Sequence, residues 1–276
     1  MDRIKQALEV AQHRGNVVAQ AKPAPAGPGI APTRAPEPPK KREARGEMSV
    51  VYTQTRRVAV APEVMERNRL IAGTGKDAVT SAYKLLRTQI LQQLSDNRWS
   101  ALAVVSARAA EGRTLTAINL AISLAQETTH TVLLVDLDLH APSVHRYFEL
   151  EPRAGLSEYL FDGVPLKDVL INPGIDRLVI LPGGKPIVNS SEMLSAPRMT
   201  AMVEELKSRY PSRIILFDLP PLLTTDDALA FSPLVDAALL IIEDGKNPKA
   251  EMHRAIGMLH STPLLGAVLN KYNGRN

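Results

Sequence analysis

ALAVVSARAAEGRTLTAIN, residues 101–119, is the stretch that decides the fold of this chain. Its apolar, β-branched start predicts a strand over residues 101–106. Apolar residues at helical spacing after Gly112 predict a helix over residues 113–127. A strand, a loop and a helix in this order are typical of a phosphate-binding loop, because the first turn of a helix offers unpaired N–H groups to an anion.

The loop has an altered form of the usual phosphate-loop pattern G-x-x-x-x-G-K-[ST]. Ala107 stands at the first glycine, Gly112 at the second, Arg113 at the lysine and Thr114 at the hydroxyl position. Taken alone, this pattern is weak, and an ordinary strand-to-helix turn stays open as the alternative. The remaining sequence therefore has to decide between the two.

The amino-acid composition excludes several classes of protein. The chain has 276 residues, 45% of them hydrophobic, and contains no cysteine, so disulfides and thiolate metal sites are excluded. It contains no run of 18 apolar residues and no hydrophobic start, so we expect neither a membrane span nor a secretory signal, and a cytoplasmic location. Nucleic acid is not an expected partner, because aromatic residues are not interleaved with the basic ones.

Charge and proline content divide the chain into three predicted parts. Residues 1–20 predict a short amphipathic helix, and residues 21–57 a Pro- and Ala-rich, disordered linker. Residues 58–276 form the expected folded domain. The first 57 residues hold 11 Lys and Arg against 5 Asp and Glu. This basic tail suits an anionic membrane or an acidic partner, and equally a solvated arm.

The folded part alternates strands with helices, which predicts an α/β fold. Buried runs such as TVLLVD, RIILFD and AALLII imply a mostly parallel sheet sandwiched by helices. Strands are predicted at residues 101–106, 131–136, 178–181, 213–218, 237–242 and 264–269. Helices are predicted at residues 113–127, 192–209 and 249–260. An earlier helix in DAVTSAYKLLRTQILQQLSD is expected to bury one face, namely Ala82, Leu85, Leu86, Ile90 and Leu94.

Three predicted strands end in polar residues, namely Ser106, Asp136 and Asp218. In parallel sheets, ligands bind beyond the carboxyl ends of the strands. A carboxylate that closes a buried strand is costly unless it meets a cation or hydrogen-bond donors. Two such carboxylates beside a phosphate loop indicate Mg2+.

A longer series of blocks resembles the bacterial tyrosine autokinases of capsule and exopolysaccharide biosynthesis. The blocks are SARAAEGRTLTAINLAISLA, VLLVDLDLHAPSVHRYF, GLSEYL, LVILPGG, SEMLSAPRM, RYPSRIILFDLPPLLTTDDAL and LLGAVLNK. The opening DRIKQALEVA is similar to the branch associated with exosortase systems. This resemblance implies a P-loop NTPase fold, the cofactors ATP and Mg2+, and a membrane polysaccharide co-polymerase of the chain-length determinant type as partner. It also implies a location at the inner membrane through that partner.

The resemblance assigns roles to three groups of residues. Asp136 and Asp138 are implied to be catalytic, since they match the second acidic motif, which serves the metal and the attacking tyrosine hydroxyl. Thr114, Asp136 and Asp218 are implied to bind the metal. The implied nucleotide-binding residues are Ala110, Glu111, Gly112, Arg113, Thr114 and Leu115.

Several positions depart from the family pattern. Arg113 replaces the lysine, and its planar guanidinium does not place a point charge where lysine does. Ala109 and Ala110 replace a Pro-Gly pair, and Ala at position 110 would cost about 1 kcal/mol relative to Gly if φ there is positive. His140 replaces an arginine. The oligomerisation motif Glu-x-x-Arg-x-x-Arg reads Ser81, Lys84 and Arg87, which weakens self-association. The C-terminal tyrosine cluster is reduced to Tyr272.

Three functions remain open at this stage. The first is an ATP-dependent tyrosine kinase or ATPase of the polysaccharide machinery, and the second is a catalytically impaired scaffold of the same pathway. The third is a partitioning ATPase, because Arg108 stands where those proteins carry an extra lysine. A zinc site at His140 and His145 is disfavoured, because a third ligand in a metal pattern is missing.

Overall fold

The computed structural model describes residues 55–71, 77–210 and 212–272. The predicted helix over residues 1–20 and most of the predicted linker over residues 21–57 lie outside the described residues. All described residues belong to one compact unit, residues 47–276. Arg56 and Arg57, the last two residues of the expected linker, form a short strand of this unit.

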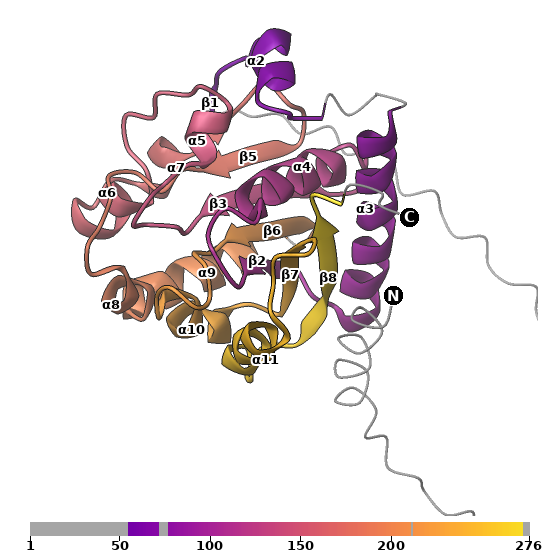
Figure 1. Cartoon of the computed structure of the whole chain (residues 1–276). Helices are drawn as coiled ribbons and strands as arrows, with labels where there is room; N and C mark the ends of the chain where they lie inside the picture. The colour runs from indigo at the N-terminus through magenta and orange to yellow at the C-terminus, as the bar shows by residue number, and fades with distance from the viewer. Residues whose placement is uncertain (1–54, 72–76, 211, 273–276) are drawn as a thin grey trace, which may run out of the picture. The chain divides into compact units, whose positions relative to one another are not determined.

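One sheet of eight strands organises the unit, in the order β1-β4-β5-β3-β6-β2-β7-β8 (Figure 1). Neighbouring strands run parallel, except for the antiparallel pair β4 and β5. The strands are β1 (Arg56–Arg57), β2 (Ala101–Ser106), β3 (Thr131–Asp136), β4 (Ile171–Asn172), β5 (Leu178–Leu181), β6 (Arg213–Asp218), β7 (Ala237–Glu243) and β8 (Leu264–Asn270). The six predicted strands are confirmed nearly to the residue.

Helices connect the strands and cover the sheet. They are α2 (Pro62–Arg67), α3 (Ala78–Asn97), α4 (Arg113–Ala125), α5 (Val144–Tyr147), α6 (Leu156–Phe161), α7 (Leu166–Val169), α8 (Ser190–Leu194), α9 (Pro197–Arg209), α10 (Asp227–Phe231) and α11 (Lys249–Met258). A 3-10 turn at Ser232–Leu234 follows α10. The predicted helix over residues 192–209 is two helices, because Pro197 has no N–H to continue the first and starts the second instead.

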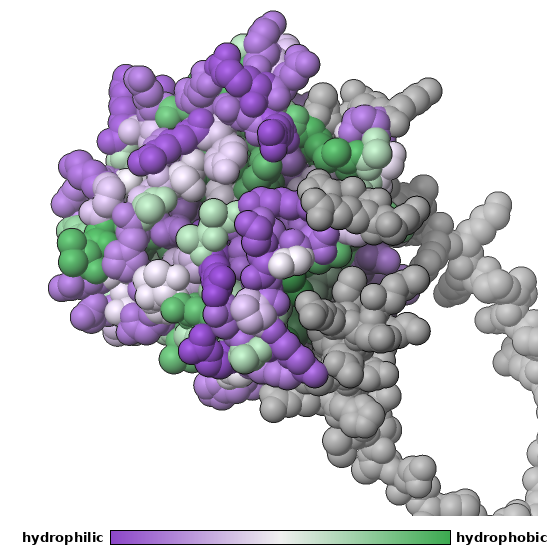
Figure 2. All heavy atoms as spheres, in the orientation of Figure 1, coloured by the Kyte–Doolittle hydropathy of each residue, from purple (hydrophilic) through white to green (hydrophobic). Residues whose placement is uncertain are grey.

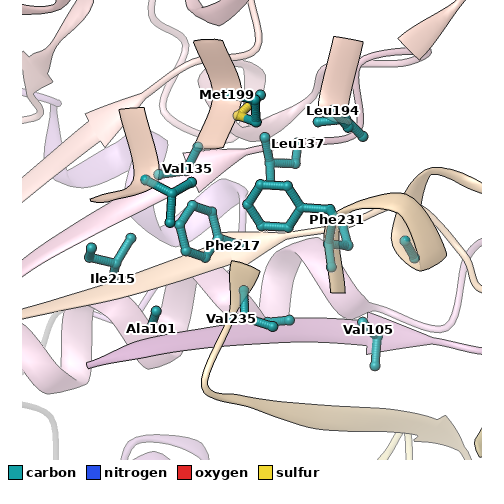
Figure 3. Packing of buried hydrophobic residues seen from close by; sticks show 14 of the residues in the cluster. Ala101, Val105, Val135, Leu137, Leu194, Met199, Ile215, Phe217, Phe231 and Val235 are labelled. Atoms are coloured by element: carbon teal, nitrogen blue, oxygen red, sulfur yellow. The ribbon is translucent and has the colours of Figure 1, made fainter. Parts of the chain in front are cut away.

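Two hydrophobic cores lie on opposite faces of the sheet. Along β3, Leu133 and Val135 belong to the core that includes residues of α9 and α10, whereas Val132 and Leu134 belong to the core under α3 and α4. In the first core, the rings of Phe217 and Phe231 meet edge to face with centroids 4.9 Å apart (Figure 3). Burial of the strands on both faces confirms the predicted sandwich.

The prediction of which face of α3 is buried is partly wrong. Ile90 and Leu94 are buried as expected, but Ala82 is exposed and Leu85 is 63% exposed. Thr80 is buried in its place, and its backbone N–H and hydroxyl both donate to the carboxylate of Asp77 at the helix start. That polar contact allows a threonine, which hydropathy places outside, to lie on the inner face.

The face of the molecule in Figure 2 is mainly hydrophilic, and its hydrophobic residues gather in small separate patches. Over the described ranges, none of the helices is both long and apolar enough to cross a membrane.

Substitution of Phe217 by Ala is expected to lower the free energy of unfolding by about 3–5 kcal/mol, because a buried aromatic ring leaves a cavity in the core. Leu85→Ala is the control, and we expect a change within about 0.5 kcal/mol, because this side chain is exposed. Urea denaturation of both variants measures the difference. A loss at Leu85 as large as that at Phe217 would show that α3 buries the other face.

Candidate functional site

Three neighbouring strands bring the predicted site residues to one edge of the sheet. β6 lies between β3 and β2, so the carboxyl ends of these three strands adjoin. Asp136 and Asp218 are partners in the register of β3 and β6. Ser106 ends β2, where its hydroxyl donates to the carbonyl of Arg108 at 2.8 Å. The sequence expectation that these strand ends converge is confirmed.

The loop between β2 and α4 has the backbone of an anion cradle. Ala110 and Gly112 both lie in the left-handed region, with φ of 63° and 85°. Position 110 therefore carries the strain that the sequence predicts for an alanine there. Throughout this fully described loop, the backbone N–H groups of residues 111–114 make no hydrogen bond within the chain. These donors are available to an anion at the start of α4, where the helix dipole is also positive.

Glu111 supports the loop through its side chain. It is only 3% exposed. Its carboxylate accepts a hydrogen bond from the N–H of Ala107 at 3.1 Å and another from the side-chain amide of Asn247. The side chain therefore fixes the loop from within, and the part of Glu111 left for a nucleotide is its backbone N–H.

Arg113 points into the acidic edge of the sheet. Its Nε donates to Asp218 Oδ1 at 2.7 Å, and its Nη2 donates to Asp138 Oδ2 at 2.8 Å. The side chain is only 7% exposed. Burial alone would lower the pKa of the guanidinium, but the two carboxylates raise it above its ordinary value. Arg113 is thus the counter-ion of the acids, whereas the sequence suggests that it grips phosphate.

The two strand-end carboxylates have perturbed acidities. Burial, followed by repulsion from Asp218, raises the pKa of Asp136 to about 7, although the N–H groups of Ser143 and Val144 donate to its Oδ2 and oppose the shift. Burial also raises the pKa of Asp218, against the opposing effects of Arg113 and the Thr114 side chain. These pKa shifts reflect a buried cluster of closely spaced carboxyl groups.

The acidic edge of the sheet offers only part of a ligand set for a magnesium ion. Among the described residues, no group of three or more His, Cys, Asp or Glu side chains forms a metal site. The side-chain oxygens of Asp136 already accept backbone N–H groups. Asp218 Oδ2 is buried without a hydrogen-bond partner, and Thr114 lies next to the same carboxylate. Because Mg2+ at phosphate sites needs only one or two protein oxygens besides phosphate and water, Asp218 and Thr114 fit it.

A second polar cluster lies at α8 and α10. The hydroxyl of Ser190 donates to Asp227 Oδ2 at 2.7 Å and lies 2.8 Å from His140 Nε2. Burial raises the pKa of Asp227, and the hydrogen bond from Ser190 opposes this shift. His140 is thereby tied to α8 and α10. Sequence reasoning missed both residues. Asp227 lies in the quoted block RYPSRIILFDLPPLLTTDDAL, and Ser190 is the residue just before the block SEMLSAPRM.

The three residues of the altered oligomerisation motif all lie on α3. Ser81 is exposed. Arg87 is only 16% exposed, because its guanidinium pairs with Glu127 at 2.9 Å and donates to the carbonyl of Ser123 at 3.0 Å. Arg87 therefore holds α3 against the end of α4 within the chain.

The sheet order and the loop between β2 and α4 together define the P-loop NTPase fold. A family model described as an AAA domain matches residues 100–246. The tyrosine-protein kinase YwqD of Bacillus subtilis (strain 168) is 31% identical over 208 residues, covering 75% of this chain and 86% of YwqD. The chain belongs to this family of bacterial tyrosine-protein kinases.

Two further comparisons agree with this assignment. The solved BceF tyrosine kinase domain superposes with a TM-score of 0.65 at 26% identity, over 77% of this chain and 90% of that domain. The succinoglycan biosynthesis transport protein ExoP of Rhizobium meliloti (strain 1021) is 28% identical over 212 residues. That match covers 74% of this chain but only 26% of ExoP, so the likeness to ExoP concerns one part of a longer protein.

The raised pKa of Asp136 predicts a specific pH dependence. The carboxyl ionises near pH 4 in the unfolded chain and near pH 7 in the folded one, so the folded state binds more protons in between. Stability should therefore fall by about 2 kcal/mol from pH 5 to pH 7 through this group. Asp136→Asn should abolish that part of the loss. Urea denaturation at both pH values tests it, and identical pH dependence in wild type and variant would refute the assignment.

Proposed function

We propose that this chain binds ATP with Mg2+ at the loop between β2 and α4 and acts in capsule or exopolysaccharide biosynthesis. The observation that carries the proposal is the row of free N–H groups at residues 111–114 beside the carboxylates of Asp138 and Asp218. Backbone donors at a helix start bind phosphate, and a nearby carboxylate suits its metal ion. Membership of the tyrosine-kinase family supports the choice of ATP.

Each residue of the proposed site has a distinct task. The N–H groups of residues 111–114 bind the phosphates, while the Thr114 hydroxyl and Asp218 Oδ2 would hold Mg2+. When bound, the ion neutralises phosphate charge and so favours phosphoryl transfer. Asp136 keeps the loop after β3 in place through the N–H groups of Ser143 and Val144. Asp138, next in that loop, is the carboxylate that would accept the proton of a tyrosine hydroxyl.

Phosphoryl transfer is less favoured than binding, because Arg113 occupies both acids. Asp138 Oδ2 already accepts from Arg113 Nη2 and is not free to receive a proton without losing that ion pair. The same guanidinium neutralises Asp218. This arrangement favours a second candidate function, a nucleotide-binding scaffold of the same pathway that transfers phosphate slowly or not at all.

The proposed partner is a membrane polysaccharide co-polymerase of the chain-length determinant type. ExoP, named as a succinoglycan biosynthesis transport protein, contains a segment similar to this chain within a protein almost four times as long as the match. That arrangement supports the hypothesis that this chain works beside a membrane transport protein. We place the chain at the inner membrane through such a partner.

Titration calorimetry with ATP, with and without Mg2+, tests the binding proposal. We expect Mg2+ to strengthen ATP binding to the wild type by at least about tenfold. Asp218→Asn should remove this effect, because a neutral amide replaces the negatively charged carboxylate that holds the ion. Asp226→Asn is the control, since Asp226 is exposed and lies at the start of α10. Equal Mg2+ dependence in the wild type and Asp218→Asn would contradict the proposed metal site.

A further inference from the structure

Side chains from the end of β8 hold the outer side of the phosphate loop. The amide of Asn270 donates from Nδ2 to the carbonyl oxygen of Glu111 at 2.8 Å. The ammonium of Lys271 donates to the carbonyl oxygen of Ala110 at 2.6 Å and pairs with Glu243 Oε2 at 3.1 Å. Two consecutive carbonyl groups of the loop are therefore fixed by two consecutive residues, Asn270 and Lys271, which we call the β8 clamp.

The direction of these carbonyl groups determines where the loop donors point. In a trans peptide the C=O and the following N–H point in opposite directions. Fixing the carbonyl of Ala110 therefore fixes the N–H of Glu111, and fixing the carbonyl of Glu111 fixes the N–H of Gly112. Both N–H groups belong to the row of free donors described above.

The loop needs such support because Ala110 is strained. Its φ of 63° lies in the left-handed region, where a Cβ atom crowds the backbone. Rotation about the N–Cα bond of Ala110 would relieve the strain, but it would also move the carbonyl group of Ala110 and turn the N–H of Glu111 away from a bound phosphate. Lys271 opposes that rotation, because it would lose its acceptor.

Contact between the clamp and the loop is close. A Cβ atom at Gly112 would lie 2.1 Å from Asn270 Nδ2, so a glycine is required where Asn270 packs against the loop. On the inner side, the carboxylate of Glu111 is held by the N–H of Ala107. The loop is thus fixed from both sides, and the outer side depends on the clamp.

We propose that Asn270 and Lys271 are positioning residues of the nucleotide site, which hold the strained loop of Ala110 in the conformation that binds phosphate. The inference rests on the proposed nucleotide binding and adds two residues to that site. Neither residue needs to touch the nucleotide, because both act through the carbonyl groups of the loop.

The test is titration calorimetry of the full chain with Mg-ADP. We expect Lys271→Met to weaken ADP binding about tenfold, and Asn270→Ala to weaken it similarly. Lys246→Met is the matched control, because Lys246 pairs with the same residue, Glu243, at 3.7 Å, whereas the carbonyl of Ala110 accepts from Lys271. It should bind ADP as the wild type does. Melting temperatures of the unliganded variants check that each one folds.

A double variant separates positioning from simple loss of charge. Glycine adopts a positive φ without strain, so Ala110→Gly combined with Lys271→Met should recover most of the lost ADP affinity. A charge effect would not be recovered. Wild-type affinity in Lys271→Met and Asn270→Ala, or no recovery in the double variant, overturns the clamp alone. No ADP binding by the wild type overturns both the clamp and the proposed function.

Discussion

The two ion pairs of Arg113 are the interaction on which the site depends. Asp136 and Asp218 are fully buried on adjacent strands, and Asp138 follows immediately, so three carboxylates crowd one edge of the sheet. Without a cation, this cluster would be strongly unfavourable in a dry interior. Arg113 supplies the cation from the first residue of α4. Removing one partner of a buried pair of this kind typically costs about 3–5 kcal/mol.

The same interaction sets the chemical character of the site. A lysine at position 113 would carry a compact charge on a flexible stem, whereas the guanidinium is planar and matches two carboxylates at once. In this chain it binds Asp138 and Asp218 together, while the backbone donors of the loop remain free. At the start of α4, the proposed anion binding thus belongs to the backbone, and the pairing with the carboxylates belongs to the side chain of Arg113. This division is why we place nucleotide binding ahead of phosphoryl transfer.

Much of the fold could be predicted from sequence because the central strands are continuous apolar runs. The runs TVLLVD and RIILFD predict burial on both faces, and their final aspartates meet where parallel strands end. The two-residue strands β1 and β4 have no periodicity to reveal them. The break before Pro197 was readable from the proline itself. The inner face of α3 was misjudged at Leu85, because the contact of Thr80 with Asp77 depends on local geometry.

The convergence of the candidate site residues could be predicted from sequence, but the hydrogen bonds and ion pairs among them could not. Thr114, Asp136 and Asp218 converge as the strand order requires. The choice of Arg113 between phosphate and carboxylates depends on side-chain geometry across 105 residues of sequence. The link from Ser190 to His140 and Asp227 likewise joins three separate segments. Tertiary contacts of this kind leave no spacing pattern in the chain.

The most direct test is to measure the rate of Mg-ATP hydrolysis by Arg113→Lys. Arg108→Lys is the matched control in the same loop. Arg108 is 51% exposed and pairs with Glu251 on α11, whereas Asp138 and Asp218 pair with Arg113. If Arg113 restrains the site by occupying Asp138 and Asp218, the lysine variant should bind Mg-ATP at least as tightly as the wild type. It should also hydrolyse ATP about tenfold faster or more, while Arg108→Lys stays unchanged. Loss of ATP binding in Arg113→Lys would contradict the account, because it would show that the guanidinium itself holds the phosphate.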